Sequence, residues 1–478
     1  MSDLLAARSQ MAMSLAFHII FSVIGIGLPL LMVIAEWRWM RTGEAQYLDL
    51  AKRWAKGAAI LFAVGAVSGT VLSFELGLLW PNFMRFAGPI IGMPFSLEGF
   101  AFFTEAIFLG IYLYGWDRIG RRAHLASGVI VALSGVLSGI FVVIANAWMN
   151  TPTGFTMIDG QAVDVRPFAA MANRAAFAQT LHMTLAAYAA LGLAVAGIHA
   201  IMILRGSTNP FHRRALAIGL AVGAPASILQ PISGDISARM VAETQPVKLA
   251  ALEGQFETER GAPLRVGGLP DVERRETRWA IELPNMLSLL AFHDPDAEVK
   301  GLTAFPRDEW PPVAIVHLAF QVMVALGTYM ALVSVWAAWR WWRGRSSTAL
   351  AGDRLLLRAL ALATPMGFIA IEAGWTVTEV GRQPWVVQGI LRTGDAVTPM
   401  PGLVVPFLVF TVLYLILGII VVYMLRQHIA RLPEQPGDPS LPRSRSSGQA
   451  LRSGQAGNRE PGTGDSATAD GTSSVASA

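Results

Sequence analysis

The sequence contains no cysteine, and this absence excludes several kinds of redox centre. Without thiolates the chain forms no disulfide bond, holds no cysteine-ligated iron–sulfur cluster and binds no copper through a cysteine sulfur. A redox metal in this protein would have to be held by histidine, methionine or carboxylate side chains. Charge is also scarce, because only 15% of the 478 residues are charged whereas 53% are hydrophobic. This composition is typical of a protein that crosses a membrane several times.

Nine apolar stretches are long enough to cross a bilayer, which requires about 20 residues each. We therefore predict an all-α polytopic membrane protein with nine transmembrane helices. The segment Met1–Leu5 lacks the basic region and the cleavage site of a signal peptide, so the first apolar stretch is expected to remain as a helix. The predicted helices span approximately residues 14–37, 54–80, 92–115, 125–149, 175–204, 213–233, 313–339, 355–378 and 402–425.

Basic residues gather in alternate connections between these helices. The connections after the first, third, fifth and seventh helices are rich in Arg and Lys, whereas those after the second, fourth and eighth are poor. By the positive-inside rule the N-terminus is expected outside and the C-terminus in the cytoplasm. The predicted division is helices 1–6 in residues 1–233, a long outer loop in 234–312, helices 7–9 in 313–432, and a disordered cytoplasmic tail rich in Ser, Gly and Pro in 433–478.

One segment of the outer loop has clear helix boundaries. Thr244 is the predicted N-cap, Pro246 suits the first helical turn, and Gly254 suits the position after the last turn. We expect a short helix between these residues.

Several polar side chains interrupt the predicted transmembrane helices, where an unpaired ionised group is costly. With the predicted orientation they all lie in the outer half of the membrane, on six different helices. Glu98 and Glu105 are seven residues apart and therefore share a helix face, as do Glu372 and Glu379. The full set is His18, Glu75, Glu98, Glu105, His182, Met323, Glu372 and Glu379.

Each of these residues also has an ordinary structural explanation. A single intramembrane histidine is more often hydrogen-bonded than metal-bound, most methionines fill gaps in packing, and Glu379 beside Arg382 could be an ion pair at a helix end. Only the convergence of the set indicates a common site. The other histidines are predicted to be interfacial or solvated, with His124, His199, His212 and His428 at cytoplasmic helix ends and His293 and His317 on the outer side.

Haem is the group that suits this set of side chains. A His/Met pair saturates the iron and gives an electron-transfer haem, whereas an iron with one strong protein ligand keeps a position for oxygen. Buried carboxylates can deliver protons to such a position. Two other classes remain open: a proton-coupled membrane transporter, which leaves the histidines and the methionine unexplained, and a di-haem membrane anchor of a quinol dehydrogenase, which leaves the carboxylates unexplained.

The string GWTVTEVGRQPW at Gly374–Trp385 resembles a signature of subunit I of the cytochrome bd family of quinol oxidases. The resemblance extends over nearly the whole chain outside the tail. It implies nine helices, three haems and a quinol site on the outer loop. It further implies an enzyme that oxidises membrane quinol at the outer face and reduces oxygen with cytoplasmic protons, separating charge without pumping. The other matching segments are Ala7–Gln10, Gly92–Gly99, Gly115–Arg118, Ala145–Pro152, Leu181–Thr184 and Gln245–Gly254.

The resemblance also implies which residues bind iron. His182 and Met323 look like the axial ligands of a low-spin haem b, and His18 and Glu379 look like the ligands of two high-spin haems. One high-spin haem is a haem b and the other is haem d or a third haem b. The sequence decides neither that choice nor which of the two ligands serves which haem.

Further roles follow from the same resemblance. Lys248 and Glu253 match loop residues that act in quinol oxidation; a regular helix puts them on different faces, so we expect them near a fraying helix end. The remaining matches are Glu98, Glu105 and Ser138 as a proton route, Trp375 as an aromatic residue between haems, and Arg382 as a partner of a haem propionate or of Glu379.

The chain departs from the family pattern in two places. Gln321 stands where many members have an arginine two residues before the axial methionine, so a positive charge near the low-spin haem is missing and its potential is expected to differ. The outer loop is short, as in a subclass that includes cyanide-insensitive members. The resemblance implies a second large membrane subunit, is compatible with a single-helix small subunit, and implies the bacterial cytoplasmic (inner) membrane.

Overall fold

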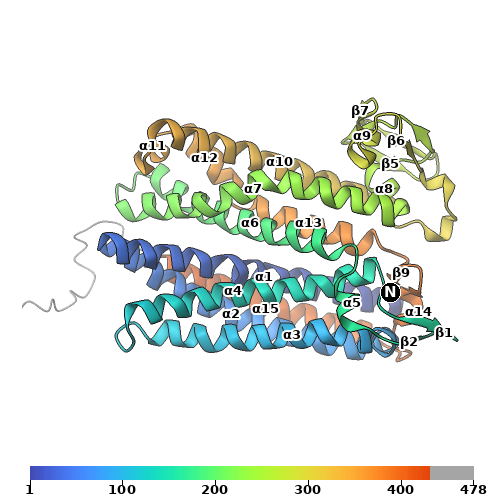
Figure 1. The fold of residues 1–478 in the computed structure, drawn as a ribbon, viewed down its shortest axis with the longest axis horizontal. Helices are drawn as coiled ribbons and strands as arrows, with labels where there is room; N and C mark the ends of the chain where they lie inside the picture. Colours follow the sequence, from blue (N-terminus) through green and yellow to red (C-terminus); the bar gives the residue numbers. More distant parts are fainter. Residues whose placement is uncertain (431–478) are drawn as a thin grey trace, which may run out of the picture. The chain divides into compact units, whose positions relative to one another are not determined.

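The computed structural model describes residues 1–430, and long helices make up most of this part of the chain (Figure 1). Nine helical segments in residues 1–430 are long and apolar enough to cross a membrane, which confirms the predicted fold class. The tail predicted at 433–478 lies outside the described residues. The long helices are α1 (Asp3–Thr42), α2 (Ala45–Leu79), α3 (Pro81–Tyr114), α4 (Arg121–Asn150), α6 (Ala176–Leu204), α7 (Pro210–Thr244), α10 (Val313–Gly344), α12 (Arg354–Ala363) with α13 (Met366–Val380), and α15 (Val404–Ala430).

Short elements fill the connections. In the described part of the chain, five two-stranded antiparallel sheets pair β1 with β2, β3 with β8, β4 with β7, β5 with β6 and β9 with β10. The short helices are α5 (Pro167–Met171), α8 (Pro246–Glu253), α9 (Met286–Phe292), α11 (Ser347–Ala351) and α14 (Thr393–Ala396), with single 3-10 turns at Leu302–Ala304 and Arg307–Glu309. The strands are β1 (Thr156–Ile158), β2 (Gln161–Val163), β3 (Glu259–Arg260), β4 (Leu264–Val266), β5 (Leu269–Asp271), β6 (Glu276–Arg278), β7 (Ile281–Leu283), β8 (Glu298–Val299), β9 (Trp385–Val387) and β10 (Leu391–Arg392).

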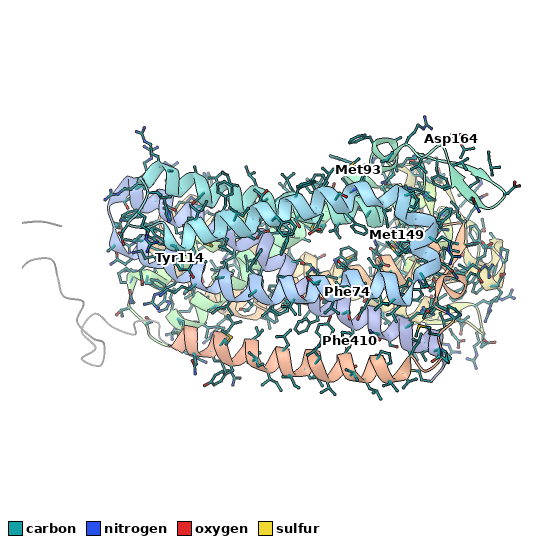
Figure 2. The ribbon with its side chains drawn as sticks, turned by 90° about the horizontal axis from the view of Figure 1, so that it is seen from below. Phe74, Met93, Tyr114, Met149, Asp164 and Phe410 are labelled. Atoms are coloured by element: carbon teal, nitrogen blue, oxygen red, sulfur yellow. The ribbon has the colours of Figure 1, made fainter. Side chains whose placement is uncertain are left out.

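The long helices pack in two groups that α6 joins. In the first group α1 contacts α2, α4 and α15, and α3 contacts α2 and α4 (Figure 1). In the second group α7, α12 and α13 contact α6, and α10 contacts α7, α12 and α13. Helix α6 also contacts α1 and α4, and α7 also contacts α1 and α2. Helices α6 and α7 approach each other closely, since a Cβ on Gly192 would lie 2.5 Å from the Cα of Gly223. Glycine is therefore required at this crossing. Many apolar side chains on the outside of the bundle are exposed, as expected for helices that face lipid; Phe74, with 65% of its surface exposed, is one of them (Figure 2).

The sixth spanning helix is longer than predicted. Instead of ending near residue 233, α7 runs to Thr244, so the loop predicted to lie outside begins at Gln245. Polar residues in this extension are accommodated within the helix, since Arg239 donates to Asp235 one turn earlier at 2.7 Å. The prediction that Thr244 caps the next helix is wrong, because its hydroxyl donates to the Met240 carbonyl at the end of α7.

The short loop helix itself lies where it was predicted. Pro246 occupies its first turn, and Gly254 follows its last residue in the left-handed conformation with φ 61°. The helix stays regular up to Glu253, so the expected fraying is not observed.

The eighth spanning segment, predicted as one helix over 355–378, consists of α12 and α13 with a break at Thr364 and Pro365. Pro365 has no backbone N–H, so the regular helical hydrogen bond to the Ala361 carbonyl cannot form, and Thr364 donates to that carbonyl instead.

Candidate functional site

His18 lies well inside α1 and its ring rests against α2. Its Nδ1 is 2.9 Å from the Ser68 hydroxyl, and a Cβ on Gly69 would lie 2.9 Å from its Cε1. The glycine is thus the only residue that leaves room for the imidazole. Since α1 begins at Asp3, His18 lies about 22 Å along the helix at about 1.5 Å per residue. Helix α1 begins before the predicted start near residue 14, so His18 lies farther from the first residue of its helix than the apolar run predicts.

His182 on α6 is held by α7. Its Nδ1 is 3.0 Å from the Ser233 hydroxyl, and the Gln230 amide nitrogen is 3.1 Å from its Nε2. Gly234 lies next to the ring, where a Cβ would approach its Cε1 to 3.7 Å. The extension of α7 beyond residue 233 therefore has a role, because it carries part of the His182 pocket.

Met323 lies on α10 against α13. Its sulfur would be 3.1 Å from a Cβ on Gly374, the first residue of the GWTVTEVGRQPW segment. No direct contact joins Met323 to His182 among the recorded contacts of the described residues, but α10 contacts α7 and α13, and both of these contact α6. A Glu372 oxygen on α13 is buried without a hydrogen-bond partner in the described part of the chain.

Glu379 lies in the last turn of α13 and is held from two sides. One carboxylate oxygen accepts from Arg382 at 2.6 Å, and the other accepts from the side-chain amide of Asn146 on α4. Arg382 is buried, and its Nε and Nη1 have no hydrogen-bond partner among the described residues. These two free donors point to an anionic group that the protein alone does not supply.

A hydrogen-bonded chain connects Glu379 to the loop 245–312. Asn150, one turn after Asn146, donates to its side-chain oxygen at 3.2 Å. The Asn150 side-chain oxygen in turn accepts from the Lys248 amine at 3.1 Å and from Gln245 at 3.2 Å. The Lys248 amine also donates to the Thr378 carbonyl, directly before Glu379. The chain of contacts therefore brings the predicted quinol residue Lys248 next to a predicted haem ligand.

Sequence reasoning missed Asn146 and Asn150 as site residues. Their signal was present, because both belong to the segment Ala145–Pro152 and lie four residues apart on one face of a helix. Asparagine is rare in an apolar helix unless it is hydrogen-bonded, because an unpaired amide costs free energy in the membrane. The two asparagines could therefore have been predicted as site residues from the sequence.

Lys248 and Glu253 are both buried on α8, outside the spanning segments. The pKa of Lys248 is lowered to about 7, chiefly by burial and also by the neighbouring Arg382, whereas Glu379 acts in the opposite direction. Burial raises the pKa of Glu253 to about 8, although Arg265 partly opposes this. The Oε2 of Glu253 has no hydrogen-bond partner in residues 1–430. Both groups are therefore able to exchange protons near neutral pH, a property typical of residues at functional sites.

The predicted proton-route residues lie together between α3 and α4. Ser138 donates to Glu98 at 3.1 Å. Glu105 is only 6% exposed, and glycines leave space for its carboxylate: a Cβ on Gly135 would lie 3.5 Å from it, and one on Gly25 3.9 Å.

Trp375 packs in an apolar cluster that includes Ile19 and Val23 of α1 and Ala187 of α6. It therefore lies between the helix that carries His18 and the helix that carries His182, which agrees with an aromatic residue between two cofactors.

Four histidines predicted at surfaces or interfaces are instead buried. His317 is fully buried, with Nδ1 2.7 Å from the Leu252 carbonyl and Nε2 3.1 Å from the Gly267 carbonyl. The Nδ1 atoms of His199 and His212 are 2.9 Å apart. His124 pairs with Glu36 at 2.8 Å. The hydropathy pattern does not predict the burial of these histidines, because it does not show which polar partners lie on neighbouring helices.

The candidate ligands fit haem better than a bare metal ion. In residues 1–430 no three His, Asp or Glu side chains form a group that could hold a metal ion. His18, His182, Met323 and Glu379 lie at separate positions, each beside a glycine or a polar partner that orients it. An iron whose remaining ligands come from a macrocycle needs only one or two such side chains. The arrangement is that of a membrane cytochrome.

Comparison with known proteins identifies the family. Residues 6–433 match the model of cytochrome bd terminal oxidase subunit I, so the chain belongs to this family. It is 39% identical to the putative cytochrome bd menaquinol oxidase subunit I of Bacillus subtilis, over 91% of this chain and 98% of that protein. It is 31% identical to the cytochrome bd ubiquinol oxidase subunit 1 of the same organism, over 92% of this chain and 97% of that protein.

A solved structure shows the same fold. The structure of bd oxidase from Geobacillus thermodenitrificans superposes with a TM-score of 0.84 at 38% identity and covers 90% of this chain and 99% of its own. Membership in this family, together with the nine apolar helices, makes the chain a multi-pass protein of the bacterial inner membrane.

Proposed function

We propose that the oxidase oxidises membrane quinol beside α8 and passes the electrons to haem iron that reduces oxygen to water. The main support for this proposal is the hydrogen-bonded chain from Lys248 through Asn150 and Asn146 to Glu379. It joins Lys248, a buried titratable group of the loop 245–312, to a candidate iron ligand. The names of the relatives, a menaquinol oxidase and a ubiquinol oxidase, support the quinol class and leave the choice of quinone open.

At the quinol site the two loop residues would share the proton chemistry. The free Oε2 of Glu253, once ionised, accepts a proton from one quinol hydroxyl. Lys248, whose amine is already held by Asn150 and Thr378, positions the other quinol oxygen. Because both groups are buried, water is excluded and the hydrogen bonds to the substrate are strengthened.

The ligand candidates divide into two kinds. His182 and Met323 would hold a low-spin haem b, and His18 and Glu379 would each hold a high-spin haem, one a haem b and the other haem d or haem b. Bound haem would supply one-electron chemistry and an open coordination position for oxygen. The two free donors of Arg382 suit a haem propionate, and no copper is required.

Protons for water formation would come through Glu98, Glu105 and Ser138 from the cytoplasmic side, so charge is separated without pumping. This requires the orientation given by the basic connections, with the N-terminus outside and the loop 245–312 on the outer face. The subunit would function with a second large membrane subunit, and a single-helix small subunit is compatible with the exposed helix faces. The domain division becomes 1–244, 245–312 and 313–432.

The substitution Asn150→Ala tests the quinol site. It leaves the Lys248 amine without a side-chain acceptor, a loss of about 1–3 kcal/mol for a buried group, so kcat/KM for quinol is expected to fall at least tenfold. The haem spectrum should stay unchanged, because no ligand is touched. As a control, Asn82→Ala removes an exposed hydrogen bond to the Asp395 carbonyl and should leave quinol oxidation intact. Unchanged kcat/KM in Asn150→Ala would contradict the proposal.

A further inference from the structure

We propose that one face of the β4–β7 sheet inserts into the bilayer and anchors the loop 245–312 to the membrane. This face, which we call the apolar face, consists of Leu264 and Val266 of β4 with Ile281 and Leu283 of β7. Its partner is the acyl region of the lipid leaflet on the loop's side of the membrane. The proposal concerns where the loop lies, so it holds or fails independently of the proposed quinol chemistry.

The apolar face is built from pairs of side chains on the two strands. Leu264 lies opposite Leu283, and Val266 lies opposite Ile281. Alternate residues of a strand point to the same side of a sheet, so these four side chains share one face. Val266, Ile281 and Leu283 are exposed, Ile281 with 66% of its surface, and Trp279 just before β7 is 81% exposed. Single exposed apolar residues are common, but a group of them on one surface indicates a partner.

The polarity of this sheet is the reverse of that expected beside water. An antiparallel sheet at a protein surface normally turns its apolar face inward and its polar face outward. Here the inward face carries Arg265, which donates to the buried Gln255 and pairs with Glu282 at 3.0 Å. The side chains directed away from the protein are the apolar ones. An apolar medium outside the loop accounts for this arrangement.

The connection from β4 to β5 reaches the depth of the membrane boundary. Helix α10 has 32 residues, whereas about 20 suffice to cross the hydrocarbon core. Arg340 and the tryptophans around it mark one interface, and about 20 residues before it the opposite boundary falls near Phe320. Gln321 lies at this level, where it accepts from the Gly267 amide at 2.9 Å and donates to the Arg265 carbonyl at 3.0 Å. The end of β4 is therefore level with the outermost acyl carbons.

The backbone of this connection is hydrogen-bonded as a chain at membrane depth must be. Irregular backbone is tolerated there only when its polar groups find partners within the protein. Gln321 pairs with the Arg265 carbonyl and the Gly267 amide, and His317 Nε2 lies 3.1 Å from the Gly267 carbonyl. Two polar side chains of α10 thus replace the water that a loop farther from the membrane would use.

The apolar face also lies next to a helix surface that already faces lipid. Ile315, Leu318 and Val322 of α10 are exposed and lie three and four residues apart, on one side of the helix and level with Gln321. The same helix contacts β5, which follows β4 after two glycines. Trp279 suits this position because tryptophan side chains gather at membrane interfaces. Continuity with the lipid-facing side of α10 favours lipid over a protein partner.

Anchoring the sheet also fixes the end of α8 relative to the bilayer. Thr277 of β6 donates to the Gly254 carbonyl at 2.8 Å, directly after the last residue of α8. Arg265 of β4 donates to the next residue, Gln255. The sheet and the end of α8 that carries Glu253 are therefore held together, and the membrane contact of one sets the height of the other.

The test measures the depth of a single label on the apolar face. The chain has no cysteine, so Ile281→Cys in the complete oxidase gives this subunit one thiol for a nitrobenzoxadiazole fluorophore, and a gel confirms which subunit carries it. Quenching by a doxyl-labelled phosphatidylcholine is compared with quenching by aqueous iodide in phosphatidylcholine vesicles. The ratio of lipid to iodide quenching is expected to be at least tenfold higher for Ile281→Cys than for Lys300→Cys, an exposed charged position of the same loop.

Two further labels complete the experiment. Val322→Cys on α10 is the lipid-facing control and should give a ratio as high as that of Ile281→Cys. Trp279→Cys replaces a side chain with little protein contact, so it gives the same reading if Ile281→Cys does not assemble. A label on the apolar face that iodide quenches as strongly as at Lys300 would overturn the inference. Protection from both quenchers would also overturn it, because another protein would then cover the face.

Discussion

Each candidate haem ligand is oriented by a neighbour that is specific to it. His18 lies against Ser68 and Gly69, and His182 lies against Ser233 and Gly234. Met323 lies against Gly374. Side chains that orient a ligand in this way fix its geometry before the cofactor binds, so loss of one ligand is expected to remove one haem rather than the whole fold.

His182→Ala and Met323→Leu are expected to remove the low-spin haem signal from the reduced-minus-oxidised spectrum. The high-spin signal that responds to carbon monoxide should remain, because His18 and Glu379 lie on other helices. Both variants should also lose quinol oxidation by at least a hundredfold. A low-spin signal of normal size in either variant would refute the assigned ligand pair.

Glu253 predicts the pH dependence of quinol oxidation. Its pKa is raised to about 8 by burial, so the carboxylate that accepts the quinol proton is scarce below pH 8 and dominant above it. The rate should therefore increase as the pH rises through about 8 and then level off. Glu253→Gln should lower the rate and abolish this increase. If the variant retained the rise near pH 8, another group would be responsible for it.

At the scale of elements, the α6–α7 crossing determines whether the His182 pocket forms. Both glycines there face backbone atoms rather than flexible side chains, so neither can be enlarged without moving a helix. Since His182 is on α6 and its partners Gln230 and Ser233 are on α7, any such movement opens the pocket.

Gly192→Ala is expected to lower the free energy of unfolding by about 1–3 kcal/mol, the usual effect of overpacking, and to reduce low-spin haem content. Gly99→Ala is the control, because a Cβ there meets nothing within 4 Å. Thermal unfolding and haem content would be measured together. Equal stability of the two variants would show that the crossing tolerates a side chain.

The sequence was sufficient to predict the helices that depend on the length of an apolar run. It was insufficient to predict which side chains are buried where two helices pack together. All nine spans follow from runs of apolar residues, and Gly254 ends α8 as its backbone freedom predicts. The extension of α7 could not be predicted, because an ion pair within one helix makes charged residues compatible with it. Burial of His124 and His317 was missed because their partners are far away in the sequence.

Across the whole chain, the distribution of basic residues predicts the orientation. A tag placed before Asp3 should be accessible to a membrane-impermeant reagent from outside intact spheroplasts, whereas a tag after residue 430 should be labelled only in inverted vesicles. A tag in the loop 245–312 should behave like the N-terminal one. Labelling of both termini from the same side would contradict the odd number of spans counted in residues 1–430.

The contacts of α10 with the outer loop also limit how this protein can be recombined with its relatives. Gln321 accepts from the Gly267 amide at 2.9 Å and donates to the Arg265 carbonyl at 3.0 Å, and His317 lies between the Leu252 and Gly267 carbonyls. Gln321 and His317 of α10 therefore hold the loop in place through hydrogen bonds to its backbone. A chimaera that exchanges residues 245–312 for those of another oxidase must also exchange positions 317 and 321. If position 321 is arginine in the donor, as the resemblance implies for many members, a transplanted loop would meet a glutamine that does not match its backbone groups.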